Sequence, residues 1–322
     1  MNPQAFLRDL EGKPDRLREL AASLDESEPW PRPLDAGRIV MIGMGSSRYA
    51  AGVAAGRLRA EGVDAVAELA SAERGSPPGE QVLAIGISAS GGTQETIEAL
   101  ARHRGASATI ALTNRPGSPI ERAADSVVPM LAGDEEGGVA CRSFQHTLAL
   151  LLALESAATA RDDGAPARLV RRAAEASEDL LDRRGSWLPA VAELLAGGPA
   201  TFTIAPVERL SSAEQGALMM REGPRRTADA CESGDWLHTD VYLTKPLDYR
   251  ALLFAGSRFD LDIMGWMRER GGRVVAVGAP VASADLEVRY RHDDDPSVAL
   301  LAEVLVAELV AATWWLDRSE GA

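Results

Sequence analysis

Three hydroxyl side chains and two glycines gather in one short turn in the first third of the chain. Residues 88–93 read Ser-Ala-Ser-Gly-Gly-Thr and follow residues 81–87, an apolar run typical of a buried strand. Glycine lets a ligand approach the backbone closely, and a helix N-terminus after the turn offers unpaired N–H donors. Ser88, Ser90 and Thr93 add neutral donors around the same point. This combination predicts a cradle for a phosphate group.

A second glycine-containing turn follows the first apolar strand of the chain. Residues 43–47 read Gly-Met-Gly-Ser-Ser and come directly after residues 38–42, Arg-Ile-Val-Met-Ile. A dinucleotide-binding fingerprint would need a third glycine where Arg48 stands, so that motif is discounted. For each hydroxyl taken alone, helix capping is the competing interpretation. The density of glycine and hydroxyl groups at residues 88–93 favours a ligand site there.

Strand-length apolar segments alternate with helical segments around these turns. Strands are expected at residues 38–43, 64–69, 81–87, 108–112, 126–130, 200–204, 251–254 and 274–277. Helices are expected between them, including residues 212–221, 260–270 and 297–316, and a capping box at residues 118–121 predicts another helix start. Mostly apolar strands separated by helices imply parallel sheets covered on both faces. Because the order recurs, the sequence predicts an α/β protein of two doubly wound, flavodoxin-like lobes.

Helical segments flank and connect the two expected lobes. Apolar residues at helical spacing, from Phe6 to Leu24, predict an N-terminal arm that Lys13-Pro14 divides into two pieces. The segment 141–183 is expected to be mostly helical, with an interruption at residues 162–166. The domains expected are an arm at residues 1–34, a first domain at 35–160, a helical linker at 161–190 and a second domain at 191–318.

The composition narrows the classes of partner. The formal net charge is −14 and no basic tract occurs, which argues against nucleic acid but not against a single phosphate. Two cysteines exclude a disulfide framework and suit a reducing cytoplasm. Charged residues near the N-terminus argue against a signal peptide, and the apolar run 148–154 is too short to cross a membrane. We therefore expect a cytoplasmic protein that has no membrane partner and no cofactor. We also expect no metal site, because the acidic cluster 293–295 lacks a second ligand group.

Several of these motifs together resemble the sugar isomerase (SIS) domain family. The resemblance is most specific at residues 87–96 and continues in the arm at 10–14, the turn at 45–47 and the segments 112–118, 132–141 and 214–222. The chain looks like the two-domain isomerase half of glucosamine-6-phosphate synthase and its aminosugar-phosphate isomerase, deaminase and deglycase relatives.

The resemblance implies a set of substrate-binding residues. They are Gly45, Ser46, Ser47, Ser88, Ala89, Ser90, Gly91, Thr93, Val139 and Ala140. It also implies a proton-shuttling role for Glu222, a homodimer, and sites near the subunit interface.

Glu222 supports that role on its own terms. It ends an expected helix whose start Ser211 and Ser212 can cap, and Gly223-Pro224 follows immediately. The negative end of a helix dipole disfavours an anion, so the pKa of Glu222 should rise and make it a better base near neutral pH. Nearby arginines would oppose that shift. The competing interpretation is a solvated glutamate at a helix end.

Three departures separate this chain from the isomerases of the family. Their ring-opening histidine is matched by Thr227, a poor proton shuttle, while His238 stands where the family has another histidine and is a candidate ring-opening acid. Their C-terminal catalytic lysine is missing, since the chain contains only Lys13 and Lys245. The pocket loop is one residue shorter, with Arg142 near the place of a lysine.

Two classes of function remain open at this point. The first is an enzyme, an aldose–ketose isomerase or a deaminase or deglycase acting on a sugar phosphate or aminosugar phosphate. The second is a protein that binds or senses a sugar phosphate without turning it over. Both predict a small-molecule sugar phosphate as the partner.

Overall fold

The computed structural model describes residues 1–31, 34, 36–159 and 164–320 in two compact units. The first-sheet unit comprises Arg16–Asp134 and Arg142–Arg171. The second-sheet unit comprises Met1–Asp15, Glu135–Cys141 and Arg172–Ala322. Two of the expected domain limits, and residues 162 and 163 of the expected interruption at 162–166, lie outside the described residues, while residues 165 and 166 already belong to helix α6 (Ala165–Asp182). The division into an arm, two domains and a linker stays a prediction.

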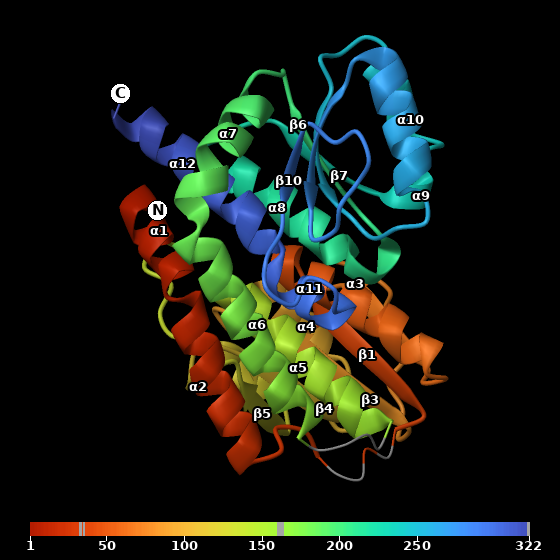
Figure 1. Cartoon of the computed structure of the whole chain (residues 1–322). Coiled ribbons are helices and arrows are strands. Elements are labelled where there is room, and N and C mark those ends of the chain that lie inside the picture. Colours follow the sequence, from red (N-terminus) through yellow and green to blue (C-terminus); the bar gives the residue numbers. More distant parts are fainter. Residues whose placement is uncertain (32–33, 35, 160–163, 321–322) are drawn as a thin grey trace. The chain divides into compact units, whose positions relative to one another are not determined.

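The first-sheet unit is built on five parallel strands in the order β2-β1-β3-β4-β5 (Figure 1). The strands are β1 (Arg38–Gly43), β2 (Ala65–Leu69), β3 (Val82–Ile87), β4 (Ala108–Thr113) and β5 (Ser126–Pro129). The helices of this unit are α3 (Gly45–Ala60), α4 (Gln94–Ala101), the 3₁₀ helix η1 (Pro119–Ala123) and α5 (Arg142–Ala158). The central strands β1, β3 and β4 are buried over nearly their whole length, as the apolar runs predict for a covered parallel sheet.

The second-sheet unit repeats the same topology. Its five parallel strands follow the order β10-β9-β8-β6-β7, which is the first order read from the opposite side. The strands are β6 (Thr201–Ala205), β7 (Ala228–Glu232), β8 (Arg250–Phe254), β9 (Arg273–Val277) and β10 (Leu286–Val288). The remaining elements are α7 (Arg184–Ala196), η2 (Val207–Arg209), α8 (Leu210–Glu222), α9 (Ser233–Trp236), η3 (Asp240–Thr244), α10 (Asp260–Arg270) and α11 (Pro296–Ala302). The prediction of two doubly wound lobes is therefore confirmed.

The helices at the two ends of the chain pack within the second-sheet unit. The arm consists of α1 (Pro3–Glu11) and α2 (Lys13–Glu26), and α6 (Ala165–Asp182) follows the first sheet. The last helix is α12 (Val304–Glu320), which contacts α1, α7 and α8. The stretch Pro296–Ser319 is apolar and long enough to span a membrane, but 89% of its most apolar window is buried within the structure. It is a helix of the protein core.

A buried ion pair joins the first turn of α2 to α12. The ammonium group of Lys13 bonds to the carboxylate of Glu308, and neither side chain is exposed to solvent. Lys13 thus belongs to the fold of the second-sheet unit, and the arm divides at Gly12, next to the Lys13-Pro14 pair that predicts the break.

Three sequence predictions differ from the structure. Strands β7 and β10 are not predicted, because both are short and exposed polar residues interrupt their apolar ones. The expected helix at residue 118 is only the short 3₁₀ helix η1, and Ser118 does not cap it. Instead Glu121 accepts the N–H of Gly117 at 2.7 Å. Helix α8 begins at Leu210, so Ser211 and Ser212 lie inside its first turn rather than at its cap.

Candidate functional site

Two predicted turns lie next to each other in the first-sheet unit. Strands β1 and β3 are paired in register, with Gly43 opposite Ile87, so the turns that follow them start side by side. Strand order reverses at this point, because β2 lies beyond β1 and the later strands lie beyond β3. Ligands of open parallel sheets bind at such a reversal, outside the carboxyl ends of the strands. The fold therefore brings Gly45, Ser46 and Ser47, at the start of α3, to the same edge as residues 88–93.

Gly91 holds the second turn in a conformation that other residues resist. Its φ angle is +62°, and a Cβ atom there would overlap Ser118 and lie 2.9 Å from Thr113 Oγ1. The carbonyl groups of the turn face inward: Ala89 accepts the N–H of Asn114 at 3.1 Å, and Gly91 accepts that of Ile120 at 2.9 Å. These bonds leave the donor side of the turn for a ligand.

The three hydroxyl groups of the turn have different surroundings. Ser88 is buried and its hydroxyl lies 3.0 Å from that of Thr93, which ties the two ends of the turn together. Ser90 is exposed, and its hydroxyl accepts the N–H of Gly92 at 3.3 Å. Thr93 occupies the N-cap position of α4, yet its side chain makes no capping bond among the described residues. The capping alternative for Thr93 is therefore not supported by the geometry.

The start of α4 retains donors that can serve an anion. The amide N–H groups of Ser90, Thr93 and Gln94 have no acceptor within the described part of the chain. The first amides of an α-helix lack intrahelical partners and lie at the positive end of its dipole. The exposed hydroxyl of Ser90 lies beside them. Together these groups can surround the oxygen atoms of one phosphate.

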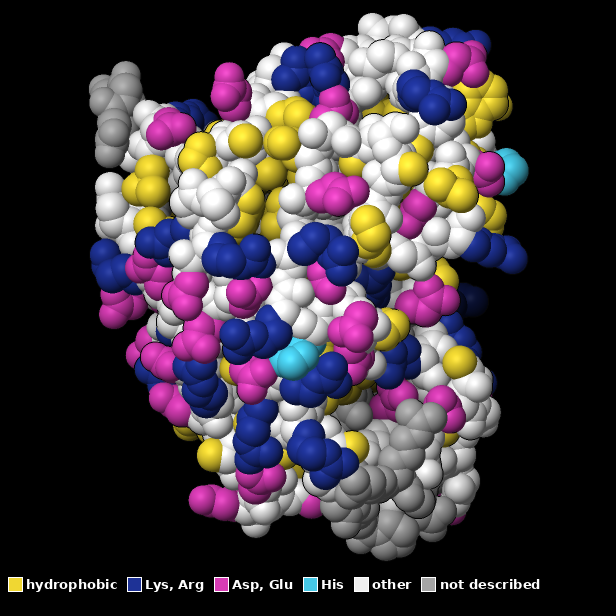
Figure 2. All heavy atoms as spheres, viewed as in Figure 1, with side chains coloured by type: hydrophobic (Ala, Val, Ile, Leu, Met, Phe, Trp, Pro, Cys, Tyr) yellow, Lys and Arg dark blue, Asp and Glu magenta, His cyan; other side chains and the backbone are white. Residues whose placement is uncertain are grey.

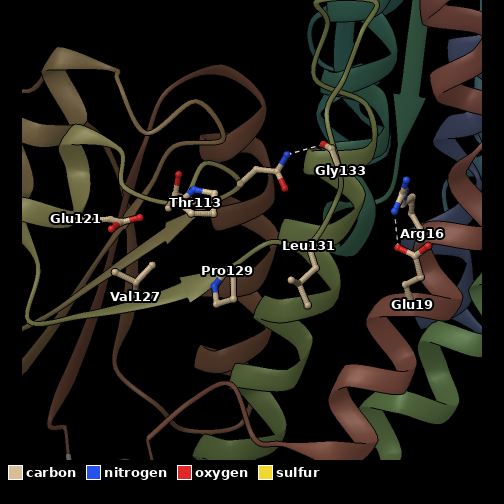
Figure 3. A pocket seen from close by; sticks show the side chains of 10 residues that line it. Arg16, Glu19, Thr113, Glu121, Val127, Pro129, Leu131 and Gly133 are labelled. Atoms are coloured by element: carbon tan, nitrogen blue, oxygen red, sulfur yellow. Dashed lines mark hydrogen bonds and ion pairs between the residues drawn. The ribbon is translucent and has the colours of Figure 1, made fainter.

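A cavity of about 580 Å³ lies at the carboxyl ends of β4 and β5, beside this turn (Figure 3). In Figure 3, Leu131 and Gly133 lie between the ends of those strands and the ion pair of Arg16 and Glu19. Thr113 lines the cavity, and its hydroxyl also lies 3.5 Å from the carbonyl oxygen of Ala89. The sequence predicts no ligand at this cavity. The sequence signal that could have indicated this cavity is the group of apolar residues in and after β5. Two of them, Val127 and Leu131, are exposed in the structure.

Glu222 is the last residue of α8 and is half-buried. Burial raises the pKa of Glu222, while the nearby positive charges of Arg225 and Arg221 oppose that rise. The direction agrees with the sequence prediction, but the leading physical cause is desolvation rather than the helix dipole. A Cβ atom on Gly223 would lie 2.9 Å from Trp315, so α12 fixes the turn that carries Glu222.

The segment 135–141 is held by side chains from outside it. Asp9 of α1 accepts the N–H of Gly137 at 2.7 Å, and Gln215 of α8 donates to the carbonyl oxygen of Ala140 at 2.7 Å. Within the segment, Glu135 accepts the N–H of Cys141 at 2.6 Å. Val139, between these anchors, is buried and Ala140 is half-buried. Helix α8 thus carries Glu222 at its end and anchors the predicted sugar-contacting segment from its middle.

His238 and Glu222 lie at opposite edges of the second sheet. Helix α8 leads from the carboxyl end of β6 to the amino end of β7, so Glu222 lies near the amino ends of the strands. His238 follows β7 and is exposed beyond its carboxyl end. The structure of one chain does not bring these two candidate catalytic side chains together. Topology decides this separation, because the two residues flank one strand of a parallel sheet.

Other predicted residues have plain structural surroundings. Lys13 is buried, whereas Lys245 is exposed after η3. Burial raises the pKa of the Cys231 thiol to about 11. His103 is buried beside Ser107, and desolvation lowers the pKa of its ring. Within the described ranges, no cluster of three or more His, Cys, Asp or Glu residues is arranged to hold a metal ion.

The visible surface mixes charges of both signs. Figure 2 shows Lys and Arg side chains interspersed with Asp and Glu side chains, without a continuous basic patch among the coloured residues of that face. A cationic face is what phosphate-backbone binding requires. The expectation that nucleic acid is not a partner stays a prediction.

Comparison with known proteins places this geometry in context. Residues 34–157 match the SIS domain. The glutamine–fructose-6-phosphate aminotransferase (isomerizing) of Aeropyrum pernix is 28% identical over 312 residues, which cover 89% of this chain and 48% of that protein. The chain spans about half the length of the curated relatives it matches.

Solved structures share the whole fold at low sequence identity. The C-terminal domain of glucosamine-fructose-6-phosphate aminotransferase from Francisella tularensis superposes with a TM-score of 0.82 at 16% identity, covering 97% of this chain and 96% of that one. Tagatose-6-phosphate ketose/aldose isomerase from Escherichia coli superposes with a TM-score of 0.77 at 16% identity, covering 98% and 93%. At these identities the likeness shows the fold.

Proposed function

Because the chain carries a SIS domain and has the fold of phosphosugar isomerases, we propose that it binds a sugar phosphate and turns it over. The reaction is an aldose–ketose isomerisation, or the deamination or deglycation of an aminosugar phosphate, with Glu222 as the proton-transfer base. The observation that carries the proposal is the turn at residues 88–93. It presents free amide donors and the Ser90 hydroxyl at the point where strand order reverses.

The binding step follows from the donors of that turn. A phosphate gains charge-assisted hydrogen bonds from the amides at the start of α4 and from Ser90, at little reorganisation cost because Gly91 and the Ser88–Thr93 contact preform the turn. Ser46 and Ser47 at the neighbouring strand end supply further hydroxyl donors. Val139 and Ala140 are proposed to contact the sugar.

The proton-transfer step is assigned to Glu222. A carboxylate removes the proton from the second carbon of the open-chain sugar and returns it to the first carbon. Only the ionised form can act as this base, and burial raises the pKa of Glu222 above its ordinary value. The rate should therefore fall as the pH drops through that raised pKa. Since Arg221 lowers the pKa, Arg221→Gln should move the acidic limb of the pH profile to higher pH.

Titration calorimetry with hexose 6-phosphates and aminohexose 6-phosphates tests the binding claim. Ser90→Ala combined with Thr93→Ala should weaken binding by a few kcal/mol at most, at about 1.5–3 kcal/mol for each hydrogen bond to a charged group. Ser76→Ala is a matched control, because among the described residues this hydroxyl bonds only to Glu68. Failure of every phosphosugar to bind, at concentrations well above millimolar, would exclude the proposal.

The surroundings of the two lysines favour a second candidate, a protein that binds or senses sugar phosphates. Lys13 is buried in its ion pair with Glu308, which leaves Lys245 as the exposed lysine of the chain. Solvent-deuterium incorporation at the second carbon, followed by NMR, separates the two candidates. The enzyme incorporates deuterium and Glu222→Gln abolishes it, whereas the sensor binds the same sugar phosphate without exchange.

We further propose a cytoplasmic homodimer. Both cysteines are free and buried, as suits a reducing compartment. Dimerisation would allow Glu222 of one chain and His238 of another to serve one site, although they lie at opposite edges of their own sheet. Mixing Glu222→Gln protein with His238→Ala protein should then restore part of the activity that each variant lacks. A monomer by light scattering, with full activity, would contradict the dimer.

A further inference from the structure

The second-sheet unit contains a cavity of its own at the corresponding place in its fold. The cavity measures about 820 Å³ and is lined by the segments that follow β6, β8 and β9, with contributions from the last residue of β7 and from beyond β10. It therefore lies outside the carboxyl ends of all five strands. Strand order reverses at β6, between β7 and β8, as it does at β1 in the first sheet. Both the position and the volume are those of a ligand site in an open parallel sheet.

The turn after β8 occupies the place that the phosphate cradle has after β3, but its anion position is filled. The carboxylate of Asp260 accepts the N–H of Gly256 at 2.7 Å and that of Ser257 at 3.1 Å. Asp260 is buried, so these backbone donors are satisfied inside the protein. A phosphate would have to displace this carboxylate. The second cavity is therefore unsuited to the phosphate group that the first turn fits.

The charges around the cavity also disfavour a phosphate. Three arginines line it, Arg209, Arg258 and Arg289, together with four carboxylates, Glu208, Glu232, Asp293 and Asp294. Arg289 is bound by both carboxylate oxygens of Asp293, at 2.5 and 2.9 Å. A dianion would meet more negative than positive charge here, whereas an uncharged ligand would meet donors and acceptors in similar number.

Buried polar groups lie at the lining of the cavity and directly behind it. Arg209 is buried and lines it, and its guanidinium bonds to Glu303 and to the carbonyl oxygen of Ala255. Directly behind Gly278, which also lines the cavity, a Cβ atom would lie 3.3 Å from the hydroxyl oxygen of Tyr290. That hydroxyl has no hydrogen-bond partner among the described residues. Buried polar atoms of this kind call for a partner that can donate as well as accept.

The rim adds surfaces suited to a sugar ring. Arg258 is exposed, and its guanidinium lies over the ring of Phe259 at 4.6 Å, with no ion pair among the described residues. Pro206, Val207 and Pro280 line the same cavity and offer apolar contacts. Hydroxyl groups can bond to a guanidinium and to carboxylates at once, while the C–H faces of a sugar pack on apolar side chains.

We propose that this cavity is a second ligand site, which takes an unphosphorylated, hydroxyl-rich molecule of monosaccharide size. It is separate from the turn at residues 88–93 and does not depend on catalysis there. A small neutral ligand of this kind binds with a Kd in the millimolar range. The two sites of one chain therefore discriminate sugars by the presence of a phosphate.

Saturation-transfer NMR and calorimetry with glucose and glucosamine, set against glucose 6-phosphate, test this proposal. Val207→Trp places a large side chain at the mouth of the cavity, where Val207 is 59% exposed, and Val207→Ala is the matched control. We expect a free sugar to bind the native chain and the Val207→Ala variant. Its affinity for Val207→Trp should be lower by a factor of at least about ten. Arg258→Ala is a second variant, which we expect to lower the affinity for the free sugar without affecting the fold.

The first turn is kept apart by its own variant. Ser90→Ala combined with Thr93→Ala should leave free-sugar binding unchanged, and Val207→Trp should leave binding of glucose 6-phosphate unchanged. The proposal is wrong if neither free sugar binds the native chain up to about 100 mM, well above the millimolar range expected for such ligands. It is equally wrong if the Ser90→Ala/Thr93→Ala variant no longer binds the free sugar while the Val207→Trp variant still does. Neither result bears on phosphosugar binding at the first turn.

Discussion

Replacing Gly91 by alanine tests whether the conformation of the turn at residues 88–93 underlies phosphate binding. The φ angle of +62° costs a residue with a Cβ atom about 1–2 kcal/mol. The new methyl group would also overlap Ser118, and crowding of this kind costs about 1–3 kcal/mol. We expect Gly91→Ala to lower the free energy of unfolding by about 2–5 kcal/mol and to abolish sugar-phosphate binding, because relief of the overlap must move the turn.

Gly92→Ala is the matched control, since a Cβ atom there meets nothing closer than Ser90 Oγ at 3.9 Å. Its stability should stay within about 1 kcal/mol of the native chain. Ser118→Gly removes the atoms that the Gly91→Ala methyl group overlaps, so the double variant should regain the crowding part and keep the cost of the φ angle. Urea unfolding and calorimetric titration with a hexose 6-phosphate measure both effects. Native stability and affinity in Gly91→Ala, or no recovery in the double variant, would refute the reasoning.

Three further predictions concern the second-sheet unit. Lys13→Met leaves the buried carboxylate of Glu308 without its partner and should lower the free energy of unfolding in urea by about 3–5 kcal/mol. Combining Lys13→Met with Glu308→Leu should recover most of this loss. Equal stability of the single and double variants would contradict this. Gln215→Ala removes the bond to Ala140 and should weaken sugar-phosphate binding by about 0.5–1.5 kcal/mol, roughly two- to tenfold, and an unchanged affinity in titration would argue against anchoring through α8. Because its pKa is raised from 9.0 to about 11, the Cys231 thiol should hold about a hundredfold less thiolate at pH 8 than an unperturbed thiol. A thiol reagent should therefore label Cys231 correspondingly more slowly in the folded chain than in the unfolded chain. Equal labelling rates would contradict the burial of this side chain.

The candidate site shows where local sequence signals suffice. Strand β1 and helix α10 (Asp260–Arg270) have the bounds that the sequence predicts, because their apolar spacing and flanking residues are local properties. The same holds for the turn at residues 88–93, whose glycines and hydroxyl groups follow an apolar strand. Strand β7 is missed because its burial alternates at the edge of the sheet, and only pairing with β6 makes it a strand.

Neighbours distant in the sequence decide how the candidate residues behave. Thr93 looks like a helix cap in the sequence, but its hydroxyl lies against Ser88 and does not cap α4. Ser118 resembles the start of a capping box, yet close packing against Gly91 shapes its surroundings and only a short 3₁₀ helix follows. The pKa of Glu222 rises mainly through burial, which depends on packing and not on its position at a helix end.

The sequence by itself therefore determined the two-lobe α/β class, the order of most strands and helices, and the turn that can cradle a phosphate. These follow from periodicity and backbone conformation, which act over a few residues. Only the tertiary structure decided that the turns at residues 45–47 and 88–93 share one strand-order reversal, that Asp260 fills the matching position in the second sheet, and that Lys13 is buried. Those facts depend on which strands pair and which faces pack, and such contacts join residues far apart in the chain.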